Sequence, residues 1–194
     1  MKQYTIPVLM FAIGFSLTSA LTTTVRGQGQ PNSAAKPLSS DDLIKNALSA
    51  APAGIAKGAA VMAPGATAAA PMIELRKGSN SWTCLPDDPS TPANDPMCMD
   101  KNAMAWAEAW MSKKTPQIPG VGLGYMLQGG STADNDDPFA KQPKAGGQWI
   151  IEPPHLMLFG TKIDPTAYSS TPDTTQPWIM WKGTPYEHLM VPVQ

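Results

Sequence analysis

The sequence predicts an α+β domain, an antiparallel sheet of about six or seven short strands with one main helix packed on one face. Short runs of alternating apolar residues recur through the second half of the chain, separated by turns from a total of 21 prolines and 16 glycines. One segment instead repeats its apolar residues at helical spacing. Charged residues are only 15% of the chain, which favours a loop-rich exported domain over a cytosolic helical one.

The N-terminal segment has the pattern of a secretory signal peptide. Lys2 supplies a positive charge, and the following run to Leu21 is apolar apart from small residues, with no further charge until Arg26. We expect residues 1–27 to be removed, although cleavage after Ala20 is an alternative. An uncleaved membrane anchor is disfavoured, because the run of about 16 residues is shorter than the roughly 20 that span a bilayer.

A signal peptide predicts an exported protein, periplasmic or extracellular. No cysteine lies near the cleavage region, which argues against a lipoprotein, and no second long apolar run predicts a transmembrane segment after cleavage. Loss of Lys2 and Arg26 lowers the basic count from 14 to 12 against 15 acidic residues, a formal net charge of −3. Without a basic block, nucleic acid is excluded as the expected partner, and an envelope ligand or protein is expected instead.

Residues 28–52 are predicted to be a linker that contains a short helix. The linker is rich in Gln, Gly, Pro, Ser and Ala. Ser40 is the predicted helix cap, followed by two aspartates in the first turn, and Pro52 ends the helix. The single α+β domain is expected to occupy residues 53–194, beginning with a helical turn near Ile55 and a strand near Val61.

The two cysteines, Cys84 and Cys98, are the only ones in the chain. In an exported protein they most simply form a disulfide, whereas the spacing is far from the C-x-x-C of redox or zinc sites. The segment before them predicts a hairpin, with strands at Met72–Arg76 and Trp82–Leu85 and a turn at 78–80. The loop between the cysteines is too rich in proline and aspartate for regular structure.

The strongest helix prediction runs from Met99 to Lys114 and ends before Pro116. Its apolar stripe is interpreted as a core face, with a binding groove as the alternative. The stripe consists of Met99, Ala103, Trp106, Ala107, Trp110 and Met111. Later strands are predicted within 120–130, 148–152, 155–159, 178–181 and 188–193.

One tripeptide occurs twice and contains both histidines of the chain, as His155-Leu156-Met157 and His188-Leu189-Met190. Residues two apart in a strand share a face. If the leucine face is core, the His/Met face is free, and pairing of the two strands would bring two imidazoles and two thioethers together. Soft sulfur with imidazole suits Cu(I). The candidate metal ligands are therefore His155, Met157, His188 and Met190.

The favoured alternative is structural. Methionine fills irregular gaps in cores, and ten of the twelve methionines lie beyond the signal peptide. A single histidine on a strand is most often a hydrogen-bonded structural residue. On this interpretation no cofactor is expected, and copper is the exception that the repeated tripeptide raises.

Other signatures are weak. Asp134, Asp136 and Asp137 match part of a calcium loop but lack its glycine and bidentate glutamate, so an Asx turn before Pro138 is preferred. No G-x-S-x-G motif is present. A hydrolase with a histidine-centred site therefore requires a catalytic set that only the fold could assemble.

Four blocks together resemble a family of uncharacterised exported bacterial proteins, over Ile55 to Val193. They are Arg76-Lys77-Gly78-x-Asn80-x-Trp82-Thr83-Cys84, Asp95-Pro96-Met97-Cys98, Pro154-His155-Leu156-Met157 and Thr184-Pro185-Tyr186-Glu187-His188-Leu189-Met190-Val191-Pro192. The resemblance implies a bacterial envelope location and carries no known activity. The leading hypothesis is thus an exported, disulfide-stabilised binding or structural protein, with a Cu(I)-binding protein and a hydrolase as alternatives.

Overall fold

The computed structural model describes residues 38–65 and 70–193. The predicted signal peptide, residues 1–27, and the first part of the predicted linker lie outside the described residues. Within them are three helices and ten strands. In chain order these are α1 (Ser40–Leu48), α2 (Ala53–Ala56), β1 (Ala60–Ala63), β2 (Ile73–Arg76), β3 (Thr83–Leu85), β4 (Met97–Met99), α3 (Lys101–Met111), β5 (Gly122–Met126), β6 (Gly130–Thr132), β7 (Ile150–Glu152), β8 (His155–Phe159), β9 (Trp178–Met180) and β10 (His188–Pro192).

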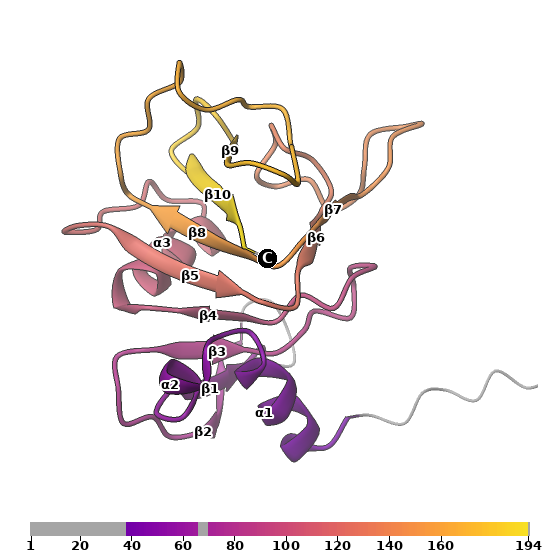
Figure 1. Ribbon diagram of the computed structural model, residues 1–194. Helices are drawn as coiled ribbons and strands as arrows, with labels where there is room; N and C mark the ends of the chain where they lie inside the picture. The colour runs from indigo at the N-terminus through magenta and orange to yellow at the C-terminus, as the bar shows by residue number, and fades with distance from the viewer. Residues whose placement is uncertain (1–37, 66–69, 194) are drawn as a thin grey trace, which may run out of the picture. The chain divides into compact units, whose positions relative to one another are not determined.

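Eight strands form one sheet in the order β2-β1-β3-β4-β5-β8-β10-β9, and β6 pairs with β7 in a separate two-stranded sheet (Figure 1). The α+β class is confirmed, but the predicted count of six or seven strands was too low. Several strands have only three residues, which is too few for an alternating pattern to show in the sequence. Pairing with neighbouring strands stabilises their extended conformation. Met97–Met99, for example, was predicted as loop and helix start but pairs with both β3 and β5.

The sheet is mixed rather than purely antiparallel, because β1 lies between β2 and β3 and runs parallel to β3. The predicted hairpin of β2 with β3 is therefore wrong. A Cβ at Gly78 would lie 2.5 Å from the backbone nitrogen of Ala60, so the chain after β2 passes directly over the start of β1. The Ala60 N–H then donates to the Trp82 carbonyl at 2.9 Å.

Helix α3 begins two residues later than predicted, since Met99 belongs to β4. Asp100 is its N-cap and accepts a hydrogen bond from the Ala103 N–H at 2.8 Å. The second oxygen of Asp100 accepts from the Leu123 N–H of β5 at 3.1 Å. One carboxylate thus caps the helix and fixes its start against the sheet, and the predicted stripe buries Ala103, Trp106 and Ala107.

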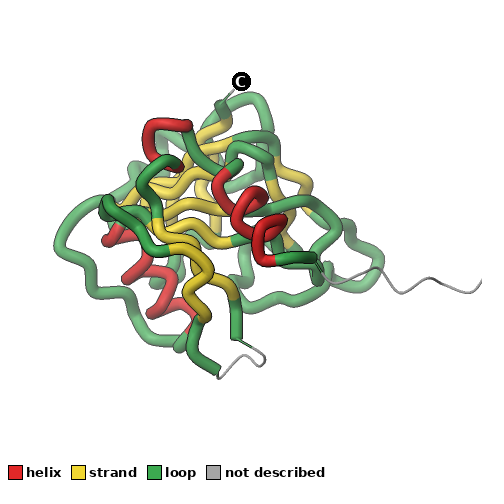
Figure 2. Tube along the Cα trace, turned by 90° about the horizontal axis from the view of Figure 1, so that it is seen from below, coloured by secondary structure: helices red, strands yellow, loops and turns green. Residues whose placement is uncertain are grey.

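Helix α1 lies on the other side of the sheet (Figure 2). Its cap is Ser39 rather than the predicted Ser40, with a capping box between Ser39 and Asp42. Ala47 is fully buried and packs with Ala50 and the strand residue Val61. The short helix expected in the linker is therefore packed on the sheet. Among the described residues, no helix is long and apolar enough to cross a membrane.

The Cys84–Cys98 disulfide is present, as predicted. The two residues face each other directly across β3 and β4 and are fully buried beneath α1. A closed loop of this length stabilises a fold by about 3 kcal/mol in the chain-entropy model. The loop is ordered by its own aspartates, as the Asp95 N–H donates to Asp87 at 2.8 Å and the Thr91 hydroxyl donates to Asp95 at 2.5 Å.

The close packing of α3 on β5 can be tested by adding a methyl group at the contact. A Cβ at Gly122 would lie 2.6 Å from the backbone nitrogen of Ala103, whereas one at Gly120 would meet nothing nearer than 3.7 Å. We expect Gly122→Ala to push the helix away and lower the free energy of unfolding by about 1–3 kcal/mol. Gly120→Ala, the matched control, should change it by less than about 0.5 kcal/mol. Urea denaturation measures both, and equal effects would contradict this packing.

Candidate functional site

The two His-x-Met segments lie on neighbouring antiparallel strands, β8 and β10, and share one face of the sheet. Met157 is directly opposite Met190. His188 is opposite Phe159, whereas His155 is opposite Pro192, at the other end of the pair. The register therefore brings the two methionines together and separates the two histidines by four residues along the strands, about 13 Å.

This shared face is the buried one. Helix α3 covers it, and the exposed fractions are 0% for His155, 2% for His188, 6% for Met157 and 1% for Met190. The leucines of the other face are better exposed, with Leu156 and Leu158 only half-buried. The leucine face is packed as well, because Leu189, 8% exposed, forms a smaller buried cluster with Ile163 and Ile179. Both faces of the sheet are therefore covered at these strands, and the His/Met face is not free. The tryptophans of α3 and of the β9 region pack against this face, and the side chains of Met157 and Met190 form part of the apolar surface that they contact.

His188 is enclosed by aromatic rings. The ring centroid of Trp106 lies 5.2 Å from the imidazole, that of Trp181 5.1 Å, and that of Phe159 4.9 Å. Its Nδ1 lies 3.0 Å from the Tyr186 carbonyl oxygen. Burial in this apolar surrounding lowers the pKa of His188 to about 4. The imidazole is neutral at physiological pH.

The imidazole of His155 is held in the same way as that of His188, by the backbone carbonyl two residues earlier in the chain. Its Nδ1 lies 2.7 Å from the Pro153 carbonyl oxygen, and burial lowers its pKa. A carbonyl oxygen only accepts, so in each neutral imidazole the proton is on Nδ1 and Nε2 carries a free lone pair. Metal-binding histidines are commonly oriented in this way, with the other ring nitrogen donating to a backbone carbonyl.

Glu152, at the end of β7, faces His155. Its Oε2 lies 3.9 Å from His155 Nε2, and Glu152 is only 6% exposed. Neither Glu152 Oε1 nor His155 Nε2 has a hydrogen-bond partner among the described residues. Burial, with a smaller contribution from the negative charge of Asp95, raises the pKa of Glu152 to about 8. Burial also raises the pKa of Asp95.

Sequence reasoning missed both of these acids. The signal available was a single charge in the apolar run Ile150-Ile151-Glu152, immediately before two prolines. In a strand, Glu152 shares the face of Ile150 rather than the exposed face of Ile151. Asp95 was hidden among the other loop aspartates, and only the fold distinguishes it.

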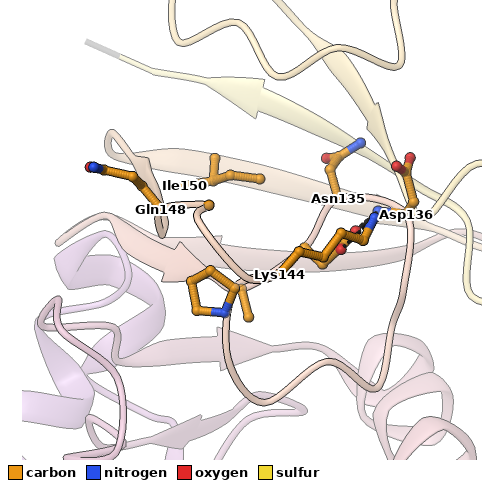
Figure 3. Close-up of a pocket in the computed structure, with 9 residues that line it drawn as sticks. Asn135, Asp136, Lys144, Gln148 and Ile150 are labelled. Atoms are coloured by element: carbon orange, nitrogen blue, oxygen red, sulfur yellow. Dashed lines mark hydrogen bonds and ion pairs between the residues drawn. The ribbon is translucent and has the colours of Figure 1, made fainter. Parts of the chain in front are cut away.

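A surface pocket of about 250 Å³ lies apart from these residues, between the 133–136 and 143–150 segments (Figure 3). Lys144 reaches across it, and its Nζ lies 2.9 Å from Asp134 Oδ2. Asp134 Oδ1 accepts from the N–H groups of Asp136 and Asp137. This is the predicted Asx turn, and the ion pair occupies the carboxylate that a calcium site would need.

Neither histidine lines this pocket or the adjoining one of about 590 Å³ beneath residues 142–149. Among the described residues, no three His, Cys, Asp or Glu side chains are grouped closely enough to hold a metal ion. A set of three or more protein ligands in this part of the chain would therefore have to include methionine. The repeated tripeptides supply two of them between the histidines.

Comparison with known proteins adds no assignment, since the sequence matches no family model, no curated protein and no solved structure. The resemblance to exported bacterial proteins therefore depends on the four sequence blocks alone.

The neutral state of His188 predicts a pH dependence of stability. Because its pKa is lower in the folded protein, the unfolded chain takes up a proton first, and stability is lost as the pH falls from 6.5 towards 4. We expect His188 to remove on the order of 2 kcal/mol between pH 7.5 and pH 5. Glu152 has the opposite dependence, because its raised pKa lowers stability as the pH rises from 4.5 to 8.

Urea denaturation of the wild type and of His188→Gln at the two pH values isolates this contribution. The wild type should lose more stability than the variant on acidification. An identical loss in both proteins would mean that His188 is already protonated at neutral pH or is solvated in the fold.

Proposed function

We propose that the protein is an exported, disulfide-stabilised binding or structural protein of the bacterial cell envelope. The observation that carries this proposal is the fully buried Cys84–Cys98 bond at the centre of the sheet. Disulfides persist in oxidising compartments and are rare in the cytosol. The signal-peptide pattern of residues 1–27 supports the same location.

An apolar patch at the end of α3 supports a binding role. It is formed by Trp110, Met111 and Phe139, of which Met111 is 55% and Phe139 38% exposed. The Trp110 indole donates to the Pro138 carbonyl at 2.9 Å, which places Phe139 beside the helix. Lys113 lies 4.9 Å over the Phe139 ring and adds a positive charge to the patch. Exposed apolar surface with a polar rim is typical of protein interaction sites.

Site-specific photo-crosslinking in a bacterial host tests the proposal. A photoreactive residue at Met111 should yield a discrete adduct with an envelope component. The same residue at Ile73 should yield none, because Ile73 is equally exposed, at 53%, but lies on edge strand β2. The recovered chain should lack residues 1–27 and contain no free thiol.

A reduced, unprocessed chain in the cytoplasm would contradict the export part of the proposal. Adducts that are the same from both positions, or absent from both, would contradict the assignment of the patch. The two parts of the proposal are thus tested separately.

Cu(I) binding is the second candidate function. The observation that favours it is the direct pairing of Met157 with Met190 on the face that carries both imidazoles. Two thioethers and one imidazole Nε2 form a soft donor set suited to Cu(I). The separation of His155 from His188 means that a single ion is expected to take one histidine with the methionine pair. The hydrolase alternative gains no comparable support, since neither histidine lines the two surface pockets.

A Cu(I) competition titration under anaerobic conditions, with the disulfide intact, tests this candidate. We expect one Cu(I) per chain, with binding lost in Met157→Leu/Met190→Leu because leucine keeps the volume and removes the thioethers. Met72→Leu, which lies outside strands β8 and β10, is the matched control and should bind normally. Weak binding, or equal binding in all three proteins, would return the Met157–Met190 pair to a structural role.

A further inference from the structure

We propose that Glu152 and His155 bind a divalent transition-metal ion at a site distinct from the Met157–Met190 pair. Three features carry this inference: an unpartnered buried atom on each of the two side chains, the short distance between the carboxyl group and the imidazole, and the lack of a lysine or arginine partner for Glu152 among the described residues. Neither the envelope role nor Cu(I) binding requires such a site. Its ligands come from β7 and β8, joined only by the two prolines at 153 and 154.

The carboxyl group of Glu152 and the imidazole of His155 lie next to each other, with Glu152 Oε2 3.9 Å from His155 Nε2. Glu152 Oε1 and His155 Nε2 are both buried and make no hydrogen bond among the described residues. Leaving such atoms unsatisfied is costly, so each calls for an explanation. The Pro153 carbonyl holds the His155 proton on Nδ1, which directs the Nε2 lone pair towards the carboxyl group.

The separation fits an ion. At 3.9 Å, His155 Nε2 and Glu152 Oε2 are too far apart for a hydrogen bond. In a tetrahedral site with bonds of about 2.0–2.1 Å the nitrogen and the oxygen lie about 3.3 Å apart, so a bound ion would draw the carboxyl group slightly closer to the imidazole. The two prolines restrict the backbone between the ligands and hold this spacing in advance.

The charge balance also favours a cation. Glu152 lies close enough to Asp95 for the two negative charges to interact. No lysine or arginine among the described residues forms an ion pair with Glu152. A divalent ion bound here would supply the positive charge that no described lysine or arginine brings to the Glu152 carboxyl group.

Gly130 and Met126 complete the surroundings. A Cβ at Gly130 would lie 3.2 Å from Glu152 Oε2, 3.5 Å from the Cβ of Asp95 and 2.8 Å from the terminal methyl of Met126. Met126 is also the direct cross-strand neighbour of His155. The missing side chain at residue 130 therefore keeps one thioether and one acid close to the Glu152 carboxyl group.

The donor set selects the class of ion. One imidazole nitrogen, one carboxylate and one nearby thioether suit Zn²⁺ or Cu²⁺, with Cu²⁺ the tighter of the two. Mg²⁺ and Ca²⁺ require more oxygen ligands than a single carboxylate supplies. With no third His, Cys, Asp or Glu in the group among the described residues, the ion keeps an open coordination position.

Equilibrium dialysis of the disulfide-intact chain against Cu²⁺, and separately against Zn²⁺, tests the proposal. Because the ligands are buried, loading is repeated by refolding in the presence of the metal. We expect one ion per chain in the wild type, and an affinity at least about 100-fold lower in Glu152→Gln and His155→Gln. The matched control is Glu74→Gln, an exposed strand glutamate, which should bind as the wild type does.

The electron paramagnetic resonance spectrum of the Cu²⁺ form should show coupling to one nitrogen, since only one histidine is a ligand. Met157→Leu/Met190→Leu should retain this site, so its failure and that of the Cu(I) candidate are distinguishable. Absence of stoichiometric metal after both loading procedures would overturn the proposal and leave Glu152 protonated. Equal retention by the Glu152→Gln variant, or coupling to two nitrogens, would also overturn it.

Discussion

The contact of α3 with β5 is the constraint on which the rest of the structure depends. Gly122 and Gly124 carry no side chain on the α3 face of the sheet, so the helix backbone at Ala103 and the side chain of Met157 come within van der Waals distance of β5. The Trp106 side chain then reaches over the sheet to Phe159 and Trp181, with ring centroids 4.3 and 6.1 Å away. The face beneath α3 therefore carries the largest buried cluster, and Met157 and Met190 of the repeated tripeptides belong to it.

Burial on this face decides the chemistry of both histidines. A buried neutral imidazole needs a local partner for its N–H, and in each tripeptide the carbonyl two residues earlier accepts it. The same geometry that satisfies one ring nitrogen leaves the other as a potential ligand. His188 is then surrounded by aromatic rings, whereas His155 meets the carboxyl group of Glu152. The two copies of one sequence motif therefore have different environments, because the antiparallel register places them at opposite ends of the strand pair.

The sequence predicted the features that depend on local patterns, and it missed those that depend on pairing across the sheet. The disulfide, the helix of residues 101–111 and the strands of the repeated tripeptides followed from composition and period. Insertion of β1 between β2 and β3 could not be predicted, because it depends on the passage of Gly78 over Ala60. Which face of β8 is buried was equally undetermined, since leucine and methionine are both apolar and only the position of α3 separates them. Glu152 was overlooked because its burial depends on β6 and β7 forming a second sheet.

The central claim is that both imidazoles are buried and neutral, with the proton on Nδ1 and Nε2 free. A long-range ¹H–¹⁵N correlation spectrum of the ¹⁵N-labelled metal-free protein at pH 7 tests it most directly, since nitrogen shifts distinguish the two tautomers from the imidazolium ion. We expect two histidine spin systems, each with a protonated Nδ1 and an unprotonated Nε2. Imidazolium patterns, or protons on Nε2, would contradict the account, because the carbonyls of Pro153 and Tyr186 could not then be the acceptors that fix the rings.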